Sequence, residues 1–251
     1  MALQKMISAT GRELAFHKTN GQGPDVVFLG GFMSDMSGTK ALYLEDWAKA
    51  RGFGYLRLDY SGHGQSGGAF EEGCIGEWAA DARDVITKAT TGKVVLVGSS
   101  MGGWISLLLA RQMPEKIAGM VTIAAAPDFT EDKLWTGFDD VQRAEMRRDG
   151  RIEIPSGYDD GPYVITNRLI EDGRENLVMR SPLNLPFPVR MLQGTADEDV
   201  DQGVALRLLD HATGPDIRLT LVKGADHRFS SPSALGLIGK SIHSGLQMAK
   251  D

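Results

Sequence analysis

Residues 94–104 read Val-Val-Leu-Val-Gly-Ser-Ser-Met-Gly-Gly-Trp. The three valines and the leucine predict a buried strand, and the apolar run over 104–110 predicts a helix directly behind it. Ser100 stands at the apex of the turn between them, in a Gly-x-Ser-x-Gly pattern with Gly98 and Gly102. A serine in such a sharp strand-to-helix turn exposes its hydroxyl above the edge of the sheet, where a base reaches it. We therefore expect Ser100 to be a nucleophile.

The same five-residue pattern occurs a second time, at Gly64-Gln65-Ser66-Gly67-Gly68. The preceding residues 60–64 contain two glycines and cannot form a strand, and Gly67-Gly68-Ala69 is a poor start for a helix. Runs so dense in glycine are typical of loops. The context therefore favours Ser100 as the nucleophile and makes Ser66 a loop residue.

Length and composition predict one α/β domain over residues 1–251. The chain is 42% hydrophobic and 24% charged, which is typical of a globular domain, and its net charge of -6 argues against nucleic-acid partners and anionic membrane surfaces. No apolar run has the length of a bilayer span, so we expect no membrane insertion. The N-terminus lacks the pattern of a signal peptide, and the single Cys74 excludes an internal disulfide, so we expect a cytoplasmic location and an inert thiol. Monomer and homodimer both remain open.

Hydrophobic periodicity predicts alternating strands and helices. We expect strands at residues 5–8, 13–18, 26–29, 55–58, 94–97, 117–123, 189–192 and 217–222, and helices at 39–51, 77–90 and 231–248. This alternation predicts a mainly parallel sheet, and the first hairpin predicts an antiparallel edge. Within the helices we expect Leu42 and Trp47 to face inward and Asp81 to lie on a solvated face.

Between residues 128 and 187 the alternation stops, which predicts a lid inserted after the sixth strand of the sheet. Its aromatic residues, Phe129, Trp135 and Tyr163, predict an apolar site for an acyl group. The alternative is that lid residues such as Leu134 and Phe138 form an ordinary core.

A serine hydroxyl needs a base, and the base needs an acid that orients it. In strand–turn–helix hydrolases the chain order is serine, acid, histidine. Only His227 lies in a loop directly after the last predicted strand, where its ring reaches the strand ends near Ser100. The other four histidines precede the serine or lie within or at the end of helices: His17, His63, His211 and His243.

The acid is expected just past the strand at 189–192. Asp197 is the first choice because it follows soonest after the turn at Gly194, and Asp199 is its rival. Asp226 adjoins the histidine, but neighbouring side chains of an extended loop point apart, so a turn or ion-pair role is favoured. The acidic residues near 197 lack the glycine and glutamate of a calcium loop, so we expect no metal and no cofactor.

Two backbone N–H groups are expected to hold the oxyanion of a tetrahedral intermediate. One belongs to Met101, which follows the serine at the start of a helix. The other belongs to Phe32, in the loop Gly30-Gly31-Phe32-Met33-Ser34 after the third strand. Ser34 of this loop is expected to contact the substrate.

Five stretches carry a resemblance to a known family. They are Leu29-Gly30-Gly31-Phe32, Gly38-Thr39-Lys40-Ala41-Leu42, Asp59-Tyr60-Ser61-Gly62, the turn at 98–104 and Asp226-His227-Arg228. By them the chain resembles the α/β-hydrolases, and among these the branch of mitochondrial palmitoyl-protein thioesterases that also cleave drug acyl-glucuronides. The resemblance implies an eight-stranded, mainly parallel sheet with helices on both faces and a lid.

The same resemblance implies a serine esterase or thioesterase without a cofactor, acting on a small-molecule ester or thioester. It puts Ser100, Asp197 and His227 on the family's triad, and Phe32 and Met101 on its oxyanion positions. The chain shows no transit-type N-terminus, so a mitochondrial location does not carry over. An amide or peptide hydrolase with the same triad and a non-catalytic ligand-binding homologue are the alternatives.

Overall fold

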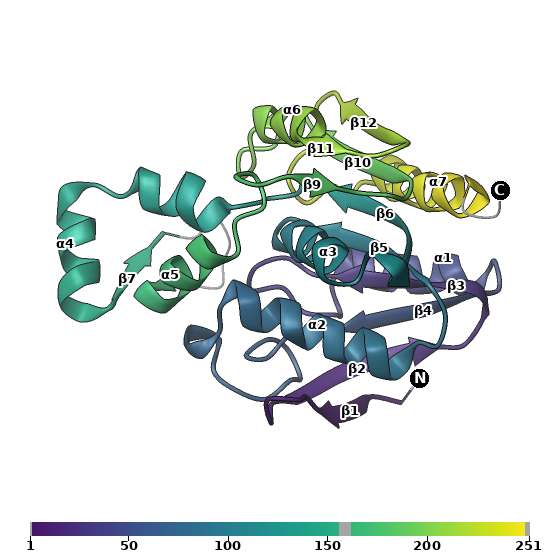
Figure 1. The fold of residues 1–251 in the computed structure, drawn as a ribbon, viewed down its shortest axis with the longest axis horizontal. Coiled ribbons are helices and arrows are strands. Elements are labelled where there is room, and N and C mark those ends of the chain that lie inside the picture. Colours follow the sequence, from purple (N-terminus) through teal and green to yellow (C-terminus); the bar gives the residue numbers. More distant parts are fainter. Residues whose placement is uncertain (1, 156–161, 249–251) are drawn as a thin grey trace.

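The computed structural model, which describes residues 2–155 and 162–248, is built around one eight-stranded sheet (Figure 1). In spatial order its strands are β1 (Gln4–Ile7), β2 (Glu13–Thr19), β4 (Phe53–Leu58), β3 (Gln22–Leu29), β5 (Val94–Ser99), β6 (Ile117–Ile123), β10 (Val189–Gly194) and β12 (Ile217–Val222). β2 pairs antiparallel with β1 and β4, and the other neighbours pair in parallel. The predicted mainly parallel sheet with an antiparallel edge is confirmed.

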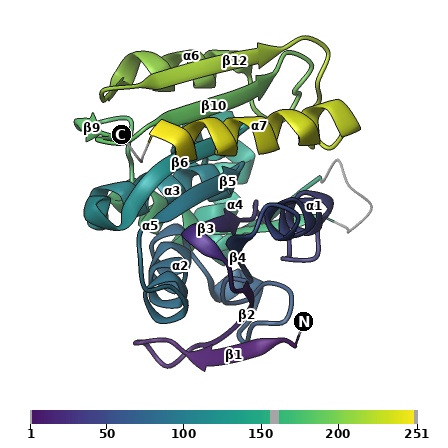
Figure 2. The same cartoon turned by 90° about the vertical axis from the view of Figure 1, so that its right-hand side faces the viewer.

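Helices cover both faces of the sheet (Figure 2). One face packs against α2 (Ile75–Ala89), α3 (Met101–Gln112) and α6 (Gln202–His211), and the other against α1 (Thr39–Lys49) and α7 (Pro232–Met248). The short elements are the helical turns η1 (Phe70–Glu72) and η2 (Pro114–Lys116) and the parallel pair β9 (Leu183–Asn184) and β11 (Ala212–Thr213). No helix in the described ranges is long and apolar enough to cross a bilayer.

The middle of the sheet holds the turn that was singled out in the sequence. Every residue of β5 and β6 is buried, because parallel strands are covered on both faces. α3 is buried from Met101 to Ala110, so its apolar run packs inside the molecule and fixes the turn at its N-terminus. The turn therefore stands on the buried centre of the fold.

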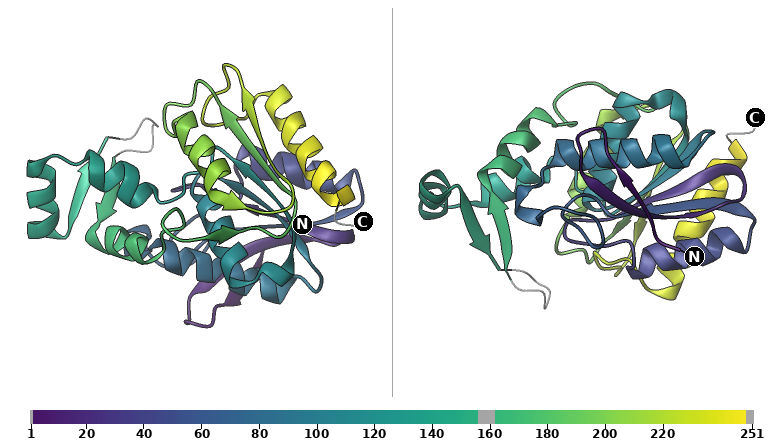
Figure 3. Two further views of the ribbon diagram at one scale, coloured as in Figure 1. Left: turned by 45° about the horizontal axis from the view of Figure 1, so that its top comes forward. Right: turned by 90° about the horizontal axis from the view of Figure 1, so that it is seen from below.

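The helices and the hairpin within residues 128–187, here called the insertion, project beyond the sheet (Figures 1 and 3). The insertion forms the π-helical segment η3 (Thr130–Trp135), α4 (Asp140–Asp149), β7 (Arg151–Ile154), β8 (Tyr163–Thr166) and α5 (Asn167–Glu175), and it includes β9. Within the insertion β7 and β8 pair as an antiparallel hairpin, which the sequence pattern did not predict. Each strand has four residues, which is too short for a clear alternation of polar and apolar side chains.

Two expectations about helix faces were also wrong. Leu42 is 44% exposed, because the inward face of α1 consists of Ala41, Leu44, Trp47 and Ala48. Asp81 of α2 is fully buried, one turn after Trp78 on the inward side.

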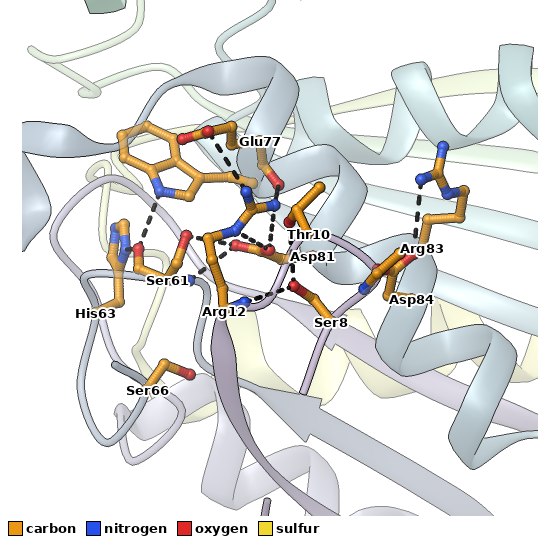
Figure 4. Close-up of polar contacts among 12 residues, drawn as sticks. Ser8, Thr10, Arg12, Ser61, His63, Ser66, Glu77, Asp81, Arg83 and Asp84 are labelled. Atoms are coloured by element: carbon orange, nitrogen blue, oxygen red, sulfur yellow. Dashed lines mark hydrogen bonds and ion pairs between the residues drawn. The ribbon is translucent and has the colours of Figure 1, made fainter. Parts of the chain in front are cut away.

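Polar partners stabilise the buried carboxylate of Asp81 (Figure 4). It accepts hydrogen bonds from Arg12 Nε at 2.8 Å, from Ser61 N–H at 2.9 Å and from Ser61 Oγ at 2.6 Å. Burying a charge is tolerated when it is paired in this way. α2 is thereby joined to the hairpin β1–β2 and to the loop after β4.

Candidate active site

Ser100 occupies a strained turn between β5 and α3. Its backbone has φ 54° and ψ -118°, a conformation that a residue with a side chain adopts only when its surroundings enforce it. Its N–H donates to Ile123 O at 2.9 Å, and its carbonyl accepts from the N–H groups of Gly103 at 2.9 Å and Ala126 at 3.1 Å. These bonds hold the turn to the end of β6.

Gly98 and Gly102 are required in the pattern because a side chain at either position would collide with neighbouring atoms. A Cβ on Gly98 would lie 2.3 Å from Gly102 O, and a Cβ on Gly102 would lie 2.1 Å from Leu29 O. Both contacts are to buried backbone atoms, one in α3 and one at the end of β3, which have no room to move. The strand and the helix therefore approach closely enough to present Ser100 only when both positions are glycine.

The structure brings Ser100, His227 and Asp197 into one hydrogen-bonded line. The Ser100 hydroxyl donates to His227 Nε2 over 3.2 Å. His227 Nδ1 lies 3.0 Å and 2.9 Å from the two carboxylate oxygens of Asp197. Because a carboxylate only accepts, Nδ1 carries the proton and Nε2 is the free base that faces the serine. The Asp197 side chain is fully buried and that of His227 is 18% exposed.

The loop after β10 surrounds Asp197 with donors. Its carboxylate accepts from the backbone N–H groups of Asp199 at 3.0 Å and Val200 at 2.8 Å, and from Gln193 Nε2 at 3.0 Å. Burial raises the pKa of Asp197, but the hydrogen bonds from His227, Val200 and Gln193 outweigh it and hold the pKa below its ordinary value. Asp197 is thus an anion that fixes the ring of His227.

The other two candidates for the acid, Asp199 and Asp226, have different roles. Asp199 contributes its backbone N–H to Asp197, and Asp226 accepts the N–H of Phe229 at 3.0 Å in a turn, as expected. Sequence reasoning missed Gln193, which is fully buried at the end of β10 and binds the carboxylate of Asp197. A polar residue in a buried strand, directly before the turn at Gly194, was the signal.

Ser66 lies apart from this site, near Ser61 and His63 (Figure 4). Its hydroxyl donates to Asp59 O at 2.7 Å and accepts from Ala15 N–H at 2.8 Å. Both bonds connect the loop after β4 to the backbone around it, so Ser66 is the loop residue that its context predicted.

Met101 and the loop that contains Phe32, which are expected to supply the two oxyanion donors, lie next to Ser100. Met101 is the first residue of α3, so its N–H belongs to the helix N-terminus. The loop at 30–34 passes beside the serine, because a Cβ on Gly31 would lie 3.4 Å from Ser100 Cβ. Phe32 follows this glycine, and the turn is closed by a bond of 3.1 Å from Ser34 N–H to Gly31 O.

A cavity of about 600 Å³ opens above Ser100 and His227. Of the expected substrate contacts, Ser34, Phe129 and Tyr163 line it. Much of the wall is apolar, because the insertion also contributes Leu134, Ile154 and Ile165, and the sheet domain contributes Phe32 and Met33. Positive charge comes from Lys40, Lys133 and Arg228.

Trp135 is not among the residues that line this cavity. Its ring packs against Phe138 at 6.1 Å and lies under the guanidinium groups of Arg174 at 4.6 Å and Arg143 at 5.8 Å. Trp135 and the buried Phe138 therefore pack in the hydrophobic core. The prediction that Trp135 contacts the substrate was wrong.

The ring of Phe32 connects the loop at 30–34 to the insertion. Its edge-to-face partners are Phe129 and Tyr163 of the insertion, both at 5.7 Å, and Phe70 at 4.8 Å and Trp78 at 6.1 Å in the sheet domain. Such pairs contribute beyond the area that they bury. Phe32 thus has a side-chain role that reasoning about its N–H missed.

In the described part of the chain, Asp197, Asp199 and His227 form the one cluster whose ligand atoms lie within 4.8 Å of one another. Two of its members are already bonded to each other. The protonated Nδ1 of His227 has no lone pair to offer a metal, so the cluster is better explained by the hydrogen-bonded line.

Comparisons with known proteins show the family to which the chain belongs. Residues 24–151 match the Hydrolase_4 family, described as serine aminopeptidase, S33. The human mitochondrial palmitoyl-protein thioesterase ABHD10 is 33% identical over 91% of this chain and 75% of its own length. The mouse ABHD10 structure superposes with a TM-score of 0.91 at 29% identity, covering 99% of both chains. A putative hydrolase from Agrobacterium vitis S4 gives a TM-score of 0.93 at 39% identity, covering 98% of this chain and all of its own. The chain belongs to the Hydrolase_4 family of serine-type α/β-hydrolases and is related to the thioesterase ABHD10.

Proposed function

We propose that this protein is a serine hydrolase that cleaves carboxylic esters or thioesters through an acyl-enzyme. The observation that carries the proposal is the line from Asp197 through His227 to Ser100 at the floor of the cavity. A hydroxyl bonded to the free nitrogen of an oriented imidazole is the arrangement needed to activate a serine.

In the proposed reaction, Ser100 Oγ attacks the acyl carbon while His227 Nε2 takes its proton. The N–H groups of Met101 and Phe32 bind the oxyanion, and Asp197 stabilises the imidazolium. Collapse of the intermediate breaks the bond to the alcohol or thiol, which leaves with the proton from His227. A water then loses a proton to His227, attacks the acyl-enzyme and releases the acid and the Ser100 hydroxyl.

The cavity supports an acyl substrate. Its volume falls within the range of about 300–1,000 Å³ that is typical of small-molecule sites. Apolar side chains of the insertion, such as Phe129 and Leu134, face it from above the serine. Together with the name palmitoyl-protein thioesterase that the relatives carry, this supports acyl-protein thioesters as substrates, with the insertion as a lid. Acyl glucuronides, which the sequence resemblance implies, are the other proposed substrates.

The test uses an oxygen ester, a thioester and an anilide with one common acyl group, in series of increasing acyl length. We expect turnover of the ester and thioester and much slower turnover of the anilide. A fluorophosphonate should label Ser100, located by mass spectrometry, and should leave the Ser100→Ala variant unlabelled. Absence of labelling together with absence of turnover would reject the proposal in favour of a non-catalytic binding protein.

An amide or peptide hydrolase is the second candidate, because the matching family is described as a serine aminopeptidase. The same substrate set decides between the two. Turnover of the anilide, or of an aminoacyl anilide, faster than that of the matched ester would favour the peptidase.

A further inference from the structure

Two of the stretches that carry the family resemblance meet at the rim of the cavity. Lys40 is the second residue of α1, and Arg228 directly follows His227. The Lys40 ammonium donates to the backbone carbonyl of Arg228 over 2.5 Å, joining residues 188 positions apart. The Lys40 side chain is half-buried and lines the cavity beside His227.

Two bonds from the loop after β10 hold the start of the loop that carries His227: Gly224 N–H donates to Thr195 Oγ1 at 2.9 Å, and Ala225 O accepts from Ala196 N–H at 3.0 Å. Bonds among the loop's own residues shape the part that follows. Phe229 N–H donates to the carboxylate of Asp226, and Ser230 Oγ donates to Arg228 O over 2.9 Å. Phe229 has φ 51° and a fully buried ring, which packs in the core beside α1. The internal bonds set the conformation of the loop, whereas contacts from other elements must set where it stands above Ser100.

We propose that Lys40 is a positioning residue for His227: its ammonium fixes the carbonyl that follows the histidine, and so places Nε2 opposite Ser100. The inference rests on the proposed function. A shift of about 1 Å in a reacting group lowers a rate by up to about 100-fold. A hydrogen bond from a charged donor is stronger than a neutral one, which suits it to this task.

The environment of Lys40 supports a bond to the carbonyl rather than an ion pair. No carboxylate of the residues described lies within ion-pair distance of its ammonium. Burial lowers the pKa of Lys40 to about 8, the Asp226 carboxylate opposes this shift, and the Arg228 guanidinium adds to it. A cation with this cost of burial needs its hydrogen bond to the carbonyl.

The acid loop offers an internal comparison. Lys133 of η3 donates to Asp199 O over 2.5 Å, so it holds the loop that carries Asp197 as Lys40 holds the loop that carries His227. Asp197, however, is also held by the N–H groups of Asp199 and Val200 and by Gln193. Loss of the Lys133 bond should therefore matter less than loss of the Lys40 bond.

The experiment compares Lys40→Met, Lys40→Arg, Lys133→Met and Lys49→Met. Lys49 is a matched control, because it lies on the same helix, pairs with Glu45 and does not line the cavity. kcat and KM are measured on the phenyl ester and the 3-carboxyphenyl ester of one acyl group, and the fluorophosphonate labelling rate of Ser100 is measured alongside. Thermal unfolding verifies that each variant folds.

We expect Lys40→Met to lower kcat about 10- to 100-fold on both esters with little change in KM. The labelling rate of Ser100 should fall in parallel, and Lys40→Arg should recover most of both, because a guanidinium also donates to the carbonyl. Lys133→Met should lose less, and Lys49→Met nothing.

Two results would overturn the inference. A loss confined to KM of the carboxylated ester would make Lys40 a binding group for anionic substrates. An unchanged kcat and labelling rate in a folded Lys40→Met would show that His227 is positioned without it. If Lys40→Met does not fold, the same comparison is made with Lys40→Gln against Lys40→Arg. Failure of the proposed function is distinct, because the wild type itself would then show neither turnover nor labelling.

Discussion

Ser100 and Ser66 stand in the same five-residue pattern and have opposite environments. The Ser100 backbone has a strained positive φ of 54°, and its hydroxyl faces His227 at the floor of a cavity. The Ser66 hydroxyl makes its hydrogen bonds to two backbone groups: it donates to Asp59 O and accepts from Ala15 N–H. A hydroxyl that donates to a free base can act as a nucleophile. A hydroxyl that both donates to and accepts from backbone groups serves only to connect them.

The largest expected difference between the two serines is in turnover. Ser100→Ala removes the attacking atom, so we expect kcat to fall about 10³-fold or more, whereas Ser66→Ala should stay within about threefold of wild type. Steady-state kinetics on the ester that the wild type cleaves best measures both. Near wild-type turnover in Ser100→Ala, or a collapse in folded Ser66→Ala, would reverse the assignment.

The second difference lies in the last glycine of each pattern. Gly102→Ala forces a Cβ to within 2.1 Å of Leu29 O, and overpacking of this severity costs about 3 kcal/mol or more of unfolding free energy. Gly68→Ala meets its nearest atom at 3.5 Å but keeps a φ of 94°, which costs about 1–3 kcal/mol. Urea unfolding compares the two variants. A loss in Gly102→Ala no larger than that in Gly68→Ala would show that the close approach of strand and helix does not require the glycine at 102.

A smaller effect is expected from Ser66→Ala on stability. The substitution leaves Ala15 N–H and Asp59 O without their partner, at a cost of about 1–3 kcal/mol, reduced where water reaches the half-buried loop. Urea unfolding of Ser66→Ala and Ser100→Ala against wild type measures it. A larger loss of stability in Ser100→Ala would contradict the structural role given to Ser66.

The smallest difference concerns pH. The folded pKa of Asp197 lies below its unfolded value, so its ionised form stabilises the fold above about pH 3.9, and this contribution is lost as the pH falls through the folded pKa. The unfolding free energies of wild type and Asp197→Asn should therefore converge as the pH falls below about 3.9 and through the folded pKa of Asp197. The gap between wild type and Ser66→Ala should stay constant, because its partners do not titrate. A constant gap for Asp197→Asn would show that its charge is not stabilised in the fold.

The sequence predicts secondary structure best where burial alone decides which residues are apolar. β5, β6 and α3 are buried throughout, and their apolar runs predicted them. The order of serine, acid and histidine along the chain led to Ser100, Asp197 and His227, because loops after parallel strands meet at one edge of the sheet.

What sequence reasoning missed depends on contacts between distant residues. Asp81 looks like a surface residue until Arg12 and Ser61 are placed beside it. Trp135 looks like a substrate contact until Arg174 is found on its ring. The bond from Lys40 to the His227 loop joins opposite ends of the chain, and no local pattern shows it.

The ring of Phe32 has a mechanical consequence. This ring contacts Phe129 and Tyr163 of the insertion, and Phe32 directly follows Gly31, which lies beside Ser100. A ligand that pushes these aromatic rings apart therefore acts on the loop that would stabilise the negative charge of the reaction. The Phe32 side chain would thus couple the size of the bound acyl group to the rate of the reaction. Shortening this side chain should alter both which acyl groups are accepted and how fast they react.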